Sequence, residues 1–189
     1  MKAMKHIITS IAILLSPLLP CAEAAEQPAP ALTDAQRENA KRDNKRTARD
    51  AMLRDSRIYN AKEYQEIEAD YQAAAARYRE ADVRTVLEAF LKKWTKGNRV
   101  GCATLYLAQK SRGEAREKLL RQCIVEFGDC YYLNGCQVGA LARLHLWSSL
   151  KADGKTAEAD ALLAELKAKF SLANDHSGKV FSDILAAQP

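Results

Sequence analysis

The fold is decided by two stretches that repeat one pattern: ATLYLAQKSRGEAREKLLRQCIVEF, from Ala103 to Phe127, and ARLHLWSSLKADGKTAEADALLAELKAKF, from Ala142 to Phe170. Each reads as an apolar helix, a turn at a glycine, and a second amphipathic helix that ends in phenylalanine. A helix pair that recurs about every 40 residues is typical of an α-helical solenoid, in which each pair buries one face against its neighbours. The repeat therefore predicts a surface that holds partners rather than a reaction centre.

Composition agrees with an almost wholly helical chain. The 189 residues include only five prolines and eight glycines, while alanine and leucine are abundant and runs of β-branched residues are rare. We expect an all-α, tetratricopeptide-like solenoid of about three helical hairpins, closed by a C-terminal capping helix. The predicted hairpins cover residues 67–97, 99–127 and 138–170, and the capping helix covers 177–187.

A family resemblance lies in the third hairpin. Its segment GKTAEA at 154–159, with Leu163, Leu166 and a break near Ser171, resembles the second half of a tetratricopeptide repeat. Residues 60–187 as a whole are similar to a group of exported bacterial proteins with tetratricopeptide-like repeats. This resemblance implies an architecture and not an activity.

The first residues read as a signal peptide. Lys2 and Lys5 precede an uncharged run, and the small-x-small pattern at 22–24 suits a signal peptidase, so we expect residues 1–24 to be cleaved and the protein to be periplasmic or secreted. Cys21 invites a lipoprotein interpretation, which is less favoured because Pro20 precedes the cysteine.

Residues 25–57 form the next predicted region: a mobile Pro/Ala tether followed by a charged, solvated helix. The remaining residues, 58–189, make the predicted helical domain. The formal net charge of +5 is concentrated between residues 37 and 57. That concentration allows a weak contact with an anionic membrane, through Arg37, Lys41, Lys45, Arg46 and Arg49. Nucleic acid is disfavoured by the predicted export and by the lack of aromatic residues for base stacking.

Four cysteines, Cys102, Cys123, Cys130 and Cys136, lie close together in the sequence. In an exported chain they predict structural disulfides. Three pairings are possible, and two of them are credible: Cys102–Cys123 with Cys130–Cys136, and Cys102–Cys130 with Cys123–Cys136. A metal site built from these cysteines with His145 or His176 lacks the usual ligand spacing, so no metal, cofactor or catalytic residue is predicted.

Four residues are candidates for partner binding. Tyr131 and Tyr132 flank the Asn134-Gly135 turn, where they either form an exposed recognition element or wedge between hairpins. Arg143 and His145 lie on the first helix of the third hairpin, although a lone histidine on an apolar helix is usually a packed residue.

These observations predict a non-enzymatic, exported scaffold or adaptor of the cell envelope, whose partner is an unknown protein or peptide. Two alternatives come from other classes. One is a metal-binding or thiol-redox module built on the cysteine cluster. The other is a peripheral protein that binds anionic membrane through its basic N-terminal helix.

Overall fold

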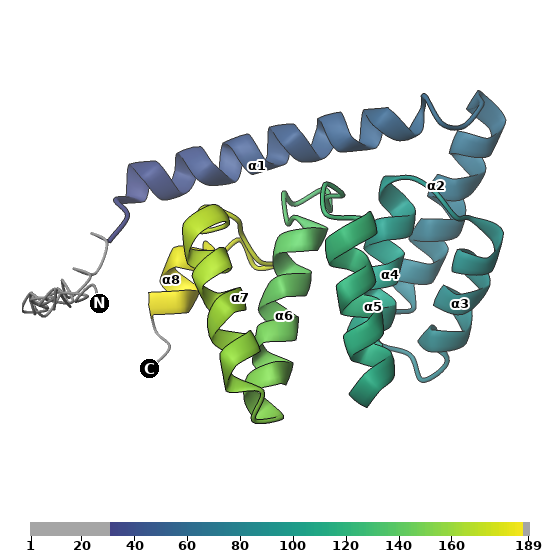
Figure 1. The fold of residues 1–189 in the computed structure, drawn as a ribbon. Coiled ribbons are helices and arrows are strands. Elements are labelled where there is room, and N and C mark those ends of the chain that lie inside the picture. The colour runs from purple at the N-terminus through teal and green to yellow at the C-terminus, as the bar shows by residue number, and fades with distance from the viewer. Residues whose placement is uncertain (1–30, 187–189) are drawn as a thin grey trace, which may run out of the picture. The chain divides into compact units, whose positions relative to one another are not determined.

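The computed structural model describes residues 31–186, and these contain eight α-helices and no strand longer than a single bridge (Figure 1). This confirms the all-α prediction. The predicted signal peptide, Cys21 and the start of the tether lie outside the described residues. The helices are α1 (Asp34–Asp55), α2 (Ala61–Ala76), α3 (Val83–Lys93), α4 (Asn98–Lys110), α5 (Gly113–Glu126), α6 (Val138–Ala152), α7 (Thr156–Lys169) and α8 (Phe181–Ala186).

Helices α2 to α7 pack in chain order, each against the next. The turns inside the second and third pairs use Gly113 and Gly154, whose φ angles of 56° and 72° suit glycine. Helix α4 is the most buried, because it also contacts α2 and α6. The largest side chains of the core come from successive helices, among them Ile67, Leu87, Leu105, Leu120, Leu146 and Leu166.

Two loops of the chain have the same structure. In the loop after α5, the backbone N–H of Val138 donates to the carbonyl of Cys130 at 2.8 Å; after α7, Phe181 donates to Ala173 at 2.8 Å. Each loop holds one antiparallel bridge, Tyr131 with Gln137 and Asn174 with Val180. Each also turns at a glycine of positive φ, 88° at Gly135 and 83° at Gly178. The internal repeat therefore includes the connecting loop as well as the helix pair.

Helix α1 runs across the ends of the other helices (Figure 1). It begins with a capping box between Thr33 and Gln36. Its buried positions, spaced for one helix face, are Ala40, Ala48, Ala51 and Asp55. The sequence predicts a solvated helix here; the outer face is exposed, while the alanine face is buried against the rest of the molecule.

Polar contacts fasten α1 along its length. Arg37 donates to Asp183 of α8 at 2.8 Å, and the amide of Asn44 donates to the Leu172 carbonyl and to Asn174, both at 2.9 Å. Further along, the Arg54 guanidinium donates to the carbonyl of Asp129 at 2.6 Å. Helix α1 therefore ties the two repeated loops and α8 together.

Candidate functional site

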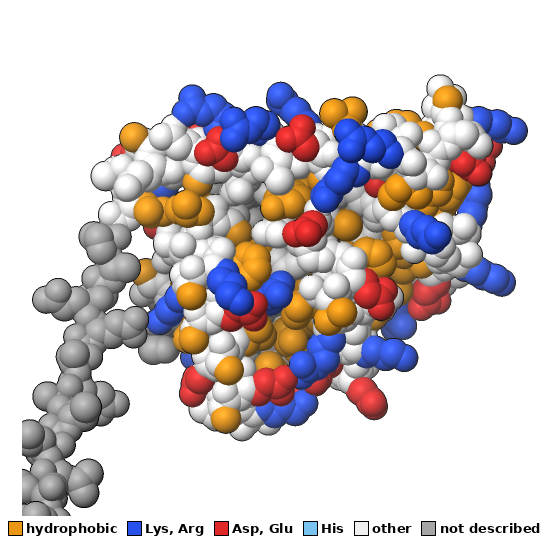
Figure 2. Space-filling model, turned by 45° about the horizontal axis from the view of Figure 1, so that its top comes forward, with side chains coloured by type: hydrophobic (Ala, Val, Ile, Leu, Met, Phe, Trp, Pro, Cys, Tyr) orange, Lys and Arg blue, Asp and Glu red, His pale blue; other side chains and the backbone are white. Residues whose placement is uncertain are grey.

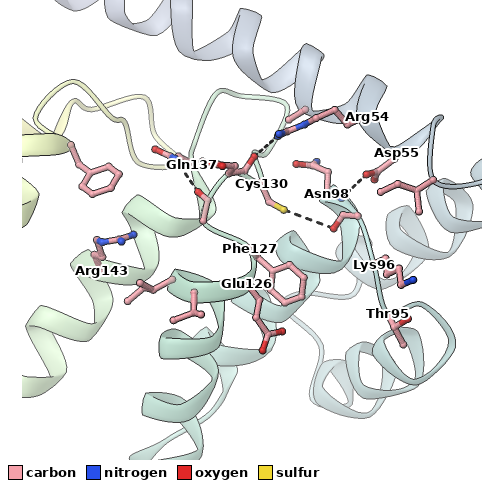
Figure 3. A pocket seen from close by; sticks show the side chains of 18 residues that line it. Arg54, Asp55, Thr95, Lys96, Asn98, Glu126, Phe127, Cys130, Gln137 and Arg143 are labelled. Carbon is pink, nitrogen blue, oxygen red and sulfur yellow. Dashed lines mark hydrogen bonds between the residues drawn. The ribbon is translucent and has the colours of Figure 1, made fainter.

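A cleft of about 640 Å³ opens where the C-terminal ends of α1 and α5 meet the N-terminal end of α4 (Figure 3). Its size falls within the range of ligand-binding pockets. Its apolar lining includes Ala51, Ile58, Ile124, Val125, Phe127 and Phe170, and its charged lining includes Arg54, Asp55, Lys96, Glu126, Asp129 and Arg143. A second hollow along α1 shares Ala51, Arg54 and Asp129 with the cleft, so the two adjoin.

Asp55 forms the base of the cleft by capping a helix that belongs to another part of the chain. Its Oδ1 accepts the backbone N–H of Asn98 at 2.6 Å, and its Oδ2 accepts that of Arg99 at 3.2 Å. The two donors are the first N–H groups of α4, which have no partner inside the helix. Burial raises the pKa of Asp55, although the two backbone hydrogen bonds and Arg99 oppose that rise.

Gly97 makes this cap possible. Its φ of 93° suits glycine, and a Cβ at this position would lie 2.7 Å from Oδ1 of Asp55. The missing side chain is therefore what lets the last residue of α1 reach the start of α4.

Asn98 holds one wall of the cleft in place. Its side-chain amide donates to the carbonyl of Tyr131 at 2.8 Å and accepts the backbone N–H of Tyr131 at 2.6 Å. Gln137 adds a hydrogen bond to the Gly128 carbonyl at 2.9 Å. The loop from 127 to 137 is thus fixed to α4 rather than free to move against it.

Arg143 lies at the side of the cleft opposite Thr95 and Lys96 (Figure 3). Its guanidinium stands 4.7 Å from the centre of the Phe170 ring and donates to the Gly139 carbonyl at 3.0 Å. Glu165 lies 3.3 Å from its Nε. Packing on the ring and pairing with the carboxylate give this cation a fixed position beside the cleft.

A second group of polar and aromatic side chains gathers on α4 and α6, away from the cleft lining. The Tyr78 hydroxyl donates to Gln109 at 2.8 Å, and the Gln109 amide nitrogen lies 3.1 Å from Nε2 of His145. Burial, together with the nearby Arg116 and His176, lowers the pKa of His145 to about 4. His145 is therefore neutral at pH 7, packed with one hydrogen-bond partner.

The four partner-binding candidates are divided between these two places. Tyr131 is half-buried beside α1, and Arg143 lies at the cleft. Tyr132 is only 4% exposed, its hydroxyl donates to the Cys102 carbonyl at 2.8 Å, and its ring packs against Tyr106. The interpretation of Tyr132 as an exposed recognition residue is therefore wrong: it is a wedge within the core.

The disulfide prediction is not met in the structure, where Cys102, Cys123, Cys130 and Cys136 are all free. The thiols of Cys102 and Cys130 point to the carbonyls of Tyr131 and Gly97, at 3.4 and 3.8 Å. Backbone hydrogen bonds, including that from Tyr132 to the Cys136 carbonyl at 2.9 Å, close the loop that a Cys130–Cys136 bridge was expected to staple. Burial raises the pKa of all four thiols, that of Cys130 to about 12.

Comparison with known proteins found no matching family model, no matching curated protein and no matching solved structure. Within residues 31–186, no helix is long and apolar enough to cross a membrane. The same residues hold no cluster of histidine, cysteine and carboxylate side chains that could bind a metal ion.

Proposed function

We propose that this protein is a non-enzymatic scaffold of the cell envelope, exported by its signal peptide, which holds an extended segment of a partner protein in the cleft at the C-terminal end of α1. In this proposal α2 to α7 form a tetratricopeptide-like solenoid of three hairpins capped by α8. Packing of each helix against its neighbours in chain order supports that arrangement.

Exposed apolar side chains at the cleft carry the proposal. Val125 is 82% exposed and Ile58 is 48% exposed, and both line the cleft beside the aromatic rings of Phe127 and Phe170. Large apolar side chains gathered at a concave surface mark binding sites more often than single scattered ones do. They offer a partner a surface to cover.

The polar groups of the cleft favour binding over catalysis. Both oxygens of Asp55 accept helix N–H groups, and both ends of the Asn98 amide pair with Tyr131. Groups held in this way position the walls of the cleft and are not free to move protons. The exposed Arg54 and Lys96, and the exposed Glu126 and Asp129, give a partner backbone or side chain both signs of charge to pair with.

Site-specific photo-crosslinking tests the proposal in the organism that makes the protein. A photoreactive amino acid at position 125 is expected to give one discrete adduct with another protein. The same group at Ala161, which is exposed on α7 outside the cleft lining, is the matched control. The substitution Ile58→Glu should abolish the adduct at 125. Equal adducts from both positions, or none from position 125, would contradict the proposal.

A further inference from the structure

The outer face of α1 carries a basic stripe that the cleft does not use. Arg42, Arg46, Arg49 and Leu53 follow the i, i+4, i+7, i+11 spacing of a single helix face, with Lys45 beside them, and all five side chains are exposed. This face lies opposite the buried alanines. Figure 2 shows the blue side chains along the upper edge of the molecule, where α1 runs in Figure 1.

Some basic side chains of α1 already form ion pairs within the molecule, and others do not. Arg37 is bound to Asp183 at 2.8 Å, and Lys41 to Glu38 at 2.7 Å, so neither of these two sequence candidates belongs to the stripe. Arg46 pairs with Asp43 at 3.1 Å, but both side chains are more than half exposed and the pair is weak. Among the described residues, no carboxylate pairs with Arg42, Lys45 or Arg49, although Asp50 is on the same helix.

The stripe is displayed on a rigid support. The contacts of Asn44, Arg54 and Asp55 with the rest of the molecule fix the rotation of α1 about its axis. Its 22 residues make a straight rod of about 33 Å. Binding through such a preorganised row of charges does not have to order the helix first.

We propose that the basic stripe docks the protein on the surface of an anionic lipid bilayer, with α1 parallel to the membrane plane. A row of cations along a straight helix matches a flat anionic surface, and Leu53, 60% exposed, adds an apolar contact on the same face. Tyrosine, phenylalanine and tryptophan are absent from α1, so the stripe has no ring for stacking on nucleic-acid bases.

Vesicle sedimentation with the full chain tests the proposal. The substitutions Arg42→Gln, Lys45→Gln, Arg46→Gln and Arg49→Gln remove the stripe. The substitutions Lys92→Gln, Arg112→Gln, Lys118→Gln and Lys167→Gln, all at exposed positions on other elements, remove the same charge and form the control. Both proteins keep the same N-terminal segment, and circular dichroism checks that both remain helical.

We expect binding to phosphatidylglycerol vesicles that weakens with salt, is absent with phosphatidylcholine alone, and falls at least about tenfold in the stripe variant but not in the control. Equal losses in both variants would show a general charge effect and overturn the proposal. So would an unchanged stripe variant. Salt-sensitive binding to an acidic polypeptide but not to vesicles would replace the membrane with a protein partner.

Discussion

Asp55 is a helix cap supplied from more than 40 residues away, at 2% exposure. Replacing it with alanine leaves the first N–H groups of α4 without acceptors in a buried place. We expect Asp55→Ala to lower the free energy of unfolding by about 2–3 kcal/mol. Urea unfolding at pH 7 measures this, and Asp50→Ala, an exposed position of the same helix, should change it by less than about 0.5 kcal/mol.

His145 makes stability depend on pH. Its folded pKa of about 4 lies below the ordinary 6.5, so the unfolded chain binds the proton more readily. Stability is therefore full above pH 6.5 and falls as the pH drops toward 4, by about 3 kcal/mol from this group alone. The change in unfolding free energy between pH 7 and pH 4 should be smaller in His145→Gln. Identical pH profiles of the two proteins would contradict the burial of His145.

The four thiols, three of them buried and that of Cys130 partly buried, should be unreactive in the folded protein. Because burial raises the pKa of each thiol, a thiol reagent at pH 8 should label Cys102, Cys123, Cys130 and Cys136 slowly in buffer and completely in denaturant. A non-reducing peptide map should show the four peptides unlinked. A bridged pair of peptides would restore the disulfide prediction made from the sequence.

At the scale of elements, α1 depends on small side chains for its position. Ala48 is fully buried, and a larger residue there would push the helix away from the loops. We expect Ala48→Leu to destabilise the protein by about 1–3 kcal/mol. Trypsin should then cut the many lysines and arginines of α1 faster than in the wild type. Ala35→Leu, at an exposed position of α1, is the control and should leave the cleavage rate unchanged.

The sequence predicts most helices because periodic leucines and glycine turns act locally. Gly113 and Gly154 locate the turns within one or two residues. Prediction from the sequence fails for residues whose role depends on a partner far away in the chain. In the sequence, Asp55 resembles the other solvated charges of its helix, and the Ala40–Ala48–Ala51 face looks too small to form a packing surface. The local pattern does not indicate that the start of α4 and the two loops lie against these residues. The one pattern that indicates a buried face of α1 is the helical spacing of these alanines, which ends in the acidic Asp55.

At the scale of the whole molecule, the contact between Arg37 and Asp183 links the two ends of the described chain. We expect Arg37→Gln to raise the hydrogen-exchange rates of α8 amides while leaving those of α2 and α3 unchanged, because α8 otherwise contacts mainly α7. Lys62→Gln, at an exposed position of α2, serves as a control for the loss of one charge. Unchanged exchange in α8 would show that this ion pair does not hold the end of the stack.

The fastening of α1 also sets an order of events during synthesis. Among the described helices a ribosome makes α1 before the others, yet Asn174 and Asp183, which hold its beginning, follow much later, and 146 residues separate Arg37 from Asp183. Helices α2 to α7 contact their chain neighbours and can assemble as they emerge. The beginning of α1 is therefore fixed later than its end, which Asn98, Arg99 and Asp129 already hold, and until then Ala40 near that beginning stays open to other proteins that meet the nascent chain.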